Sequence, residues 1–249
     1  MRIALLAGLA LIAAPMLEGQ SLASRIDRVK DGTVRLSFPA REGVCGNGRG
    51  NISTYSRDSR GEWEHDCESG PVRLVIDRAG GRSTALRAYV GGQWRGTATQ
   101  DLGAVDAKEA SDWLFGLAGR NEGASEDAIF PATLAEGVET WPGLLRIARN
   151  DRVSQKTRRN AIFWLGQAAG EAATKGLDSI VQDDNGDREV RESAIFALSQ
   201  RPREEGIPAL IRVARNSHDP KLRKTALFWL GQSEAPEAVA LFEEILTEN

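Results

Sequence analysis

Histidine and cysteine are scarce in this chain, and it has neither a long apolar run nor a marked excess of charge. The 249 residues include only 2 His and 2 Cys, too few for zinc sites built from several such ligands. No apolar run reaches the roughly 18 residues of a membrane span. The formal net charge is −3, which argues against a nucleic-acid binder that depends on bulk charge.

The first 23 residues have the three-part pattern of a signal peptide. Arg2 supplies a positive charge, residues 3–14 are apolar and uncharged, and Pro15 ends the run. Ser21 and Ala23 place small residues at the two positions that a signal peptidase reads. An uncleaved anchor is the alternative, but the apolar run is short for a span. We expect cleavage after residue 23, no membrane insertion afterwards, and a periplasmic or secreted mature protein.

Export changes the interpretation of the two cysteines. Cys45 and Cys67 would lie in an oxidising compartment, and two cysteines allow a single pairing. The alternative is a catalytic or metal-binding thiol within Glu64–Glu68, the segment that contains His65 and Cys67. That role requires a lowered thiol pKa or further soft ligands, and nothing nearby supplies them. The sequence therefore favours a Cys45–Cys67 disulfide.

Residues 24–105 have the patterns of β structure. Thr33–Phe38 alternates apolar and polar side chains, and Val72–Asp77 and Thr84–Val90 have the composition of further strands. The last two are separated by Ala79–Arg82, whose two glycines accept the positive φ of a tight turn. We expect a small antiparallel β domain over residues 24–105, held by one disulfide.

A ten-residue pattern occurs three times in the C-terminal half. The copies are residues 158–167, 191–200 and 223–232, at offsets of 33 and 32 residues. A preceding segment also repeats, because Pro142–Asn150 matches Pro208–Asn216 at twice that spacing. Each unit is therefore predicted to be a pair of helices joined by a polar turn. A pair cannot bury its apolar face alone, so stacked pairs share one core.

The repeat resembles the HEAT repeat family in its short bacterial form. The resemblance rests on the turn aspartates Asp187 and Asp219, also expected to cap helices, and on the Val/Leu-Arg pairs that follow them. It covers residues 140–249 strongly and 107–139 loosely. It implies an α-solenoid over residues 106–249. It also implies a structural role for the repeated arginines, which would bond the turn aspartate or a carbonyl of a neighbouring repeat: Arg158, Arg191 and Arg223.

One face of the second helix departs from the usual family pattern. Phenylalanine stands where such repeats usually carry a polar residue: Phe163, Phe196 and Phe228. Glutamine follows four residues later on the same helix face: Gln167, Gln200 and Gln232. A charged residue precedes each phenylalanine by four positions: Arg159, Glu192 and Lys224. One hypothesis is that these side chains line the concave surface and bind an extended peptide or a partner helix. The alternative is that the three rings pack as core, with Trp164 and Trp229 beside them.

Some HEAT-like families are enzymes, but their required patterns are missing. Iron-dependent hydroxylases need several His–Glu pairs, and alkylpurine glycosylases need a basic groove. Phycobilin lyases share the short repeat, but an exported protein has no obvious bilin acceptor. No acid–base set can be placed, because His65 lies in the β region and His218 in a repeat turn.

These absences favour binding over catalysis. We expect a non-catalytic, monomeric exported scaffold or adaptor that binds a protein or peptide, without nucleic acid, cofactor or metal. Two alternatives remain open. One is a regulator or accessory subunit of an envelope enzyme or stress pathway, and the other is a lyase-like enzyme.

Overall fold

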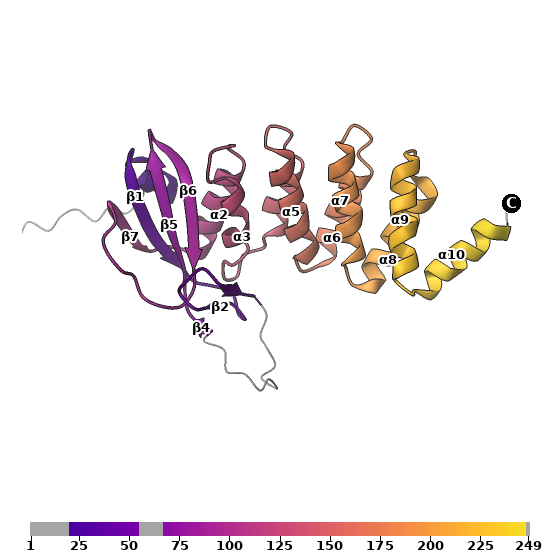
Figure 1. The fold of residues 1–249 in the computed structure, drawn as a ribbon, viewed down its shortest axis with the longest axis horizontal. Coiled ribbons are helices and arrows are strands. Elements are labelled where there is room, and N and C mark those ends of the chain that lie inside the picture. The colour runs from indigo at the N-terminus through magenta and orange to yellow at the C-terminus, as the bar shows by residue number, and fades with distance from the viewer. Residues whose placement is uncertain (1–19, 55–66, 248–249) are drawn as a thin grey trace, which may run out of the picture.

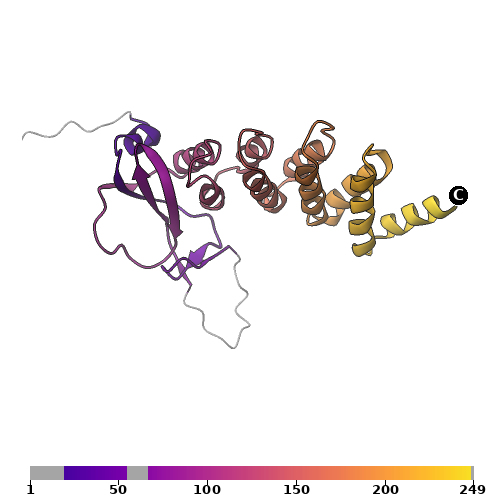
Figure 2. The same ribbon diagram turned by 45° about the horizontal axis from the view of Figure 1, so that its top comes forward.

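The protein has a small sheet region followed by a long stretch of helices. The structure, a computed structural model, describes residues 20–54 and 67–247. Figure 1 shows the sheet region at one end and helices lying side by side in a row toward α10, and Figure 2 shows the same order from a second direction. Most of the predicted signal peptide, residues 1–19, lies outside the described residues.

The larger sheet has the strand order β6–β5–β1–β7. Its strands are β1 (Gly32–Phe38), β5 (Val72–Ala79), β6 (Arg82–Tyr89) and β7 (Gln100–Ala104). The first three are the predicted strands; they pair antiparallel, and Gly80 and Gly81 form the expected turn with φ of 57° and 76°. β7 pairs parallel with β1, so the prediction of a purely antiparallel domain is wrong. The ten-residue stretch between β6 and β7 brings the chain back to the end of the sheet where β1 begins, which a strand parallel to β1 requires.

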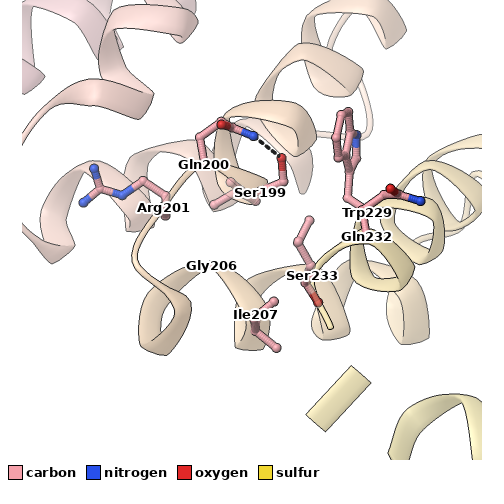
Figure 3. A pocket seen from close by; sticks show the side chains of 10 residues that line it. Ser199, Gln200, Arg201, Gly206, Ile207, Trp229, Gln232 and Ser233 are labelled. Carbon is pink, nitrogen blue, oxygen red and sulfur yellow. Dashed lines mark hydrogen bonds between the residues drawn. The ribbon is translucent and has the colours of Figure 1, made fainter. Parts of the chain in front are cut away.

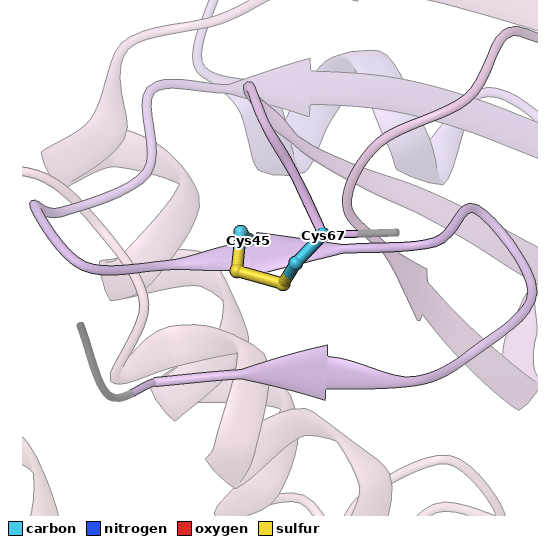
Figure 4. Close-up of a disulfide and its surroundings, with 2 residues drawn as sticks. All are labelled: Cys45 and Cys67. Atoms are coloured by element: carbon cyan, nitrogen blue, oxygen red, sulfur yellow. A yellow bond between two sulfur atoms is a disulfide. The ribbon is translucent and has the colours of Figure 1, made fainter. Parts of the chain in front are cut away.

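A second, smaller sheet contains the disulfide. Its strands are β2 (Cys45–Gly46), β3 (Ile52–Ser53) and β4 (Glu68–Ser69), in the order β3–β2–β4. Cys45 and Cys67 are bonded, as Figure 4 shows, so the predicted pairing is confirmed and the free-thiol alternative is wrong. Glu64, His65 and Asp66 of that alternative lie outside the described residues. Because the strands have two residues each, the disulfide is a main link of this sheet.

A short helix precedes the sheet and was not predicted. In α1 (Leu22–Asp27), Ser21 is the N-cap and its side chain accepts from the Ser24 N–H. Leu22 is buried, and its N–H donates to the carboxylate of Glu109. Cleavage after residue 23 would delete this cap and this buried side chain. A leader that leaves α1 intact therefore has to end before Ser21.

The sheet region and the first helices share one hydrophobic core. The buried side chains of β1 and β5 belong to the same cluster as those of α1 and α2 (Ala107–Ala118). A 3₁₀ turn and a short helix follow α2: η1 (Glu126–Ala128) and α3 (Ile129–Ala132). The Arg41 N–H donates to the Leu134 carbonyl at 2.7 Å, which ties the chain after β1 to the end of α3. The change from strands to helices near residue 106 is therefore not a break in the core.

Three helix pairs and a final helix follow. Their helices are α4 (Trp141–Ala148), α5 (Gln155–Gln167), α6 (Glu171–Val181), α7 (Arg188–Ser199), α8 (Arg203–Asn216), α9 (Pro220–Gln232) and α10 (Pro236–Thr247). The second helices α5, α7 and α9 contact one another in sequence, and so do the first helices α4, α6 and α8. The repeat spacing thus predicts both the pairing and the stacking.

The turn aspartates cap helices and link neighbouring pairs. Asp187 accepts from the N–H groups of Glu189 and Val190 at the start of α7, and from the Gln155 side chain of the preceding pair. Asp219 caps α9 and accepts from Arg188 of α7 at 2.9 Å. Both predicted caps are confirmed.

The repeated arginines have the predicted structural role, with one difference. Arg158 lies 3.7 Å from the Asp187 carboxylate in the next pair. Arg191 and Arg223 instead donate to carbonyls within their own pair, those of Val181 and Ser217.

Arg201, which follows α7, joins two neighbouring pairs through a buried guanidinium. The side chain is 5% exposed and donates to the Thr174 hydroxyl at 2.8 Å and to the Glu205 carboxylate at 2.9 Å. It also donates to three carbonyls at and after the end of α5: those of Gly166, Ala168 and Gly170. Helix C-terminal carbonyls have no intrahelical partner, so Arg201 supplies one from the next pair.

This network makes stability depend on pH. Hydrogen bonds from the Thr174 hydroxyl and from Arg201 hold the pKa of Glu205 below its ordinary value. Such a carboxylate stabilises the fold above its unfolded pKa, about 4.3, and this contribution is lost as the pH falls through the lower folded pKa. Glu205→Gln is therefore expected to lose less stability than the native chain between about pH 6 and about pH 3 in urea unfolding. Glu204→Gln, at an exposed neighbouring position, should behave like the native chain; equal losses in all three would contradict this role.

Candidate partner-binding face

The three predicted phenylalanines lie at the surface. Phe163, Phe196 and Phe228, called the Phe row below, are 47%, 40% and 56% exposed. The alternative in which they form core is therefore wrong. Helix phase explains this placement, because the neighbouring positions Ile162 and Leu165 of α5 point inward and are buried. Phe163 then lies on the opposite, solvent side.

The other predicted residues extend the same face along each helix. The glutamines are exposed at its C-terminal side: Gln167, Gln200 and Gln232. At its N-terminal side Arg159 and Lys224 are exposed, and Glu192 is half-buried. The structure thus brings eight of the nine predicted residues onto the second helices of three neighbouring pairs, and the ninth, Gln200, is the C-cap of α7.

Two tryptophans pack beside the exposed row, where the sequence predicted them only for the alternative in which the rings form core. Trp229 of α9 packs on Phe196 of α7 with ring centroids 5.1 Å apart, and it also contacts Phe228 of its own helix. Trp164 of α5 contacts Phe163 and stacks on Phe130 of α3 at 4.9 Å. Each Trp therefore contacts a Phe of its own helix and a Phe of an earlier one. Trp164 and Trp229 occupy equivalent positions in the repeat, and this match was the signal in the sequence for these contacts.

A hollow of about 870 Å³ lies between α5 and α7. Ile162, Phe163 and Phe196 provide its apolar lining. Charged side chains line it toward the start of the two helices: Lys156, Arg159, Glu189 and Glu192. Its lining is therefore amphipathic.

A second, smaller hollow of about 180 Å³ lies beside α9, at the glutamine end of the face. Figure 3 shows Gln200, Trp229 and Gln232 around it, with the Gln200 amide donating to the Ser199 hydroxyl at 3.1 Å. Glutamine side chains carry both donors and acceptors, so this end can hydrogen-bond the backbone of an extended segment.

Residues 20–54 and 67–247 contain no cluster of three or more His, Cys, Asp or Glu side chains placed to hold a metal ion. Over the same ranges, none of the helices has the length and apolarity needed to cross a bilayer. The groups that this face exposes are aromatic rings, side-chain amides and charged groups.

Stacked helix pairs with one exposed apolar row define a helical-repeat protein. Residues 180–249, from the end of α6 through α10, match the family of HEAT repeats. This part of the chain is thus similar to HEAT repeats, and it includes Phe196, Phe228 and two of the three repeat copies. No curated protein matches it. HEAT repeats commonly mediate protein–protein interactions.

Proposed function

We propose that this chain is a non-catalytic scaffold or adaptor that binds a protein or peptide partner along the face formed by α5, α7 and α9. In this proposal the helix pairs form a short α-solenoid, and the binding face is its concave side. The observation that carries it is the Phe row, in which three large rings are exposed at equivalent positions of adjacent helices. Isolated exposed apolar residues are common, but a regular row is typical of an interaction surface.

We further propose that the protein acts outside the cytoplasm, in the periplasm or beyond. The disulfide supports an oxidising compartment. The signal-peptide pattern of the N-terminal residues points the same way.

The test is a pull-down from envelope extract with the full chain and with Phe163→Ser/Phe196→Ser/Phe228→Ser. We expect a partner that the native chain retains and the triple variant loses, with an affinity at least about 100-fold lower, because clustered aromatic side chains dominate interface energies. The triple variant should keep its helical circular dichroism, since the rings lie at the surface.

A matched control removes apolar side chains that are exposed elsewhere. Val239→Ser/Leu246→Ser changes two side chains of α10 that are 51% and 78% exposed. This variant should retain the partner. A partner held equally by all three proteins would place binding on another surface, and a folded chain that retains no partner would overturn the scaffold proposal.

A further inference from the structure

The hollow between α5 and α7 coincides with a break in the tryptophan pattern. The position held by Trp164 in α5 and by Trp229 in α9 is Ala197 in α7. Trp229 reaches back onto Phe196 of the preceding pair. By the same geometry, a Trp at position 197 would cover Phe163, but the Ala197 methyl group is too short to do so.

The small residue at position 197 also sets the distance between the two helices. A Cβ added to Gly166 of α5 would lie 3.1 Å from the Cβ of Ala197, so the helices approach closely there. Nearer their N-termini the gap stays open, and the faces of Phe163 and Phe196 line it. The aromatic contacts along the Phe row are thus interrupted between Phe163 and Phe196, where the hollow lies.

The charged groups around this opening are paired, with one exception. Lys156 bonds the Glu126 carboxylate, and Arg159 lies 4.0 Å from that of Glu189. Glu192 also lines the hollow, one helical turn before Phe196, and is half-buried. In the part of the chain that the structure describes, the Glu192 side chain makes no hydrogen bond or ion pair. An unpaired, half-buried carboxylate beside two aromatic rings favours a cationic ligand.

We propose that this hollow receives an arginine or lysine side chain of the bound partner. Its methylene groups cover the Phe163 and Phe196 rings, and its charged end bonds the Glu192 carboxylate. The charges of Lys156 and Arg159 are offset by their acidic partners, so they do not exclude a cation. This inference rests on the proposed function, and it specifies the chemistry of the partner segment.

The experiment is selection of random peptides displayed on phage against the full chain, followed by titration of synthesised hits. We expect the selected peptides to share a basic residue, whose replacement by uncharged citrulline or norleucine weakens binding about 10-fold. Glu192→Gln should weaken the basic peptide by a similar factor and leave the uncharged peptide unchanged. Glu192→Lys should reject basic peptides.

The control has the same change in net charge at a distant position. Glu204→Gln lies at the exposed start of α8 and should bind the basic peptides like the native chain. Peptides that bind through the Phe row without a basic residue would overturn this inference and leave the proposed function standing. Failure to select any peptide that depends on the Phe row would overturn both. Basic peptides that bind Glu192→Gln as tightly as the native chain would also overturn the inference.

Discussion

Replacing Arg201 by alanine is expected to lower the free energy of unfolding by about 3–5 kcal/mol, the typical cost of breaking a buried ion pair by removing one partner. The Arg201 side chain is 5% exposed, so little water is available to replace its hydrogen bonds. Its loss would leave the Glu205 carboxylate without its cation and strip the carbonyls at the end of α5 of their donor. The effect should appear as a lower urea midpoint, followed by far-ultraviolet circular dichroism.

Arg203 provides the matched control. It lies two residues further on and bonds Glu237 at 2.8 Å, but both side chains are more than half exposed. Arg203→Ala should therefore cost less than about 1 kcal/mol. Arg201→Lys should fall between the two alanine variants, because one ammonium cannot reproduce the geometry of a guanidinium. Equal losses for the two alanine variants would show that the Arg201 network does not hold the pairs together.

Replacing both Cys45 and Cys67 by serine is expected to destabilise the smaller sheet by about 3 kcal/mol. The bond closes a loop between residues 22 positions apart, and its removal restores conformational freedom to the unfolded segment. The strands of this sheet have two residues each, so their hydrogen bonds cannot compensate. Hydrogen exchange with mass spectrometry should show faster exchange in β2, β3 and β4.

Exchange in the distant helices is the internal control for this variant. Protection of α7 and α9 should stay unchanged, because β2 and β4 of the smaller sheet lie beside the larger sheet, away from these helices (Figure 1). Unchanged exchange in the smaller sheet would contradict the prediction. Equal loss of protection throughout the chain would show that the sheet region and the distant helices unfold as one unit.

Local patterns predicted much of the helical region. Val190, Ala194 and Leu198 recur at helical spacing, and all three are buried in α7 as expected. Asp187 and Asp219 were recognised as caps because a short acidic side chain can accept from the first N–H groups of a helix. These features depend only on residues close together in the chain.

Elements held by distant contacts were missed. α1 has six residues, and its apolar side chains pack with those of α2. β7 has a single buried side chain, Leu102, and exists as a strand because it pairs with β1. Neither segment has a periodicity long enough to predict its structure, since the partners that stabilise both are far away in sequence.

The candidate face, too, was predicted in part from the sequence and in part decided by the packing. The repeat placed the nine predicted residues on equivalent helix positions, but whether Phe163, Phe196 and Phe228 were core or surface stayed open. Phenylalanine suits both environments, and only the packing of helix on helix determines which face is covered. The partners of Arg201 also come from two helix pairs, so no local pattern predicted that network.

The repeated helix pairs, their spacing, the caps Asp187 and Asp219 and the pairing of the cysteines follow from the order of residues alone, because each is governed by short-range geometry or by elimination. The exposed Phe row, the hollow between α5 and α7, and the unpaired Glu192 were decided by the tertiary structure. They depend on side-chain sizes across a helix interface, such as Ala197 against Gly166. Such a fit is a property of two surfaces in contact, and neither helix contains it by itself.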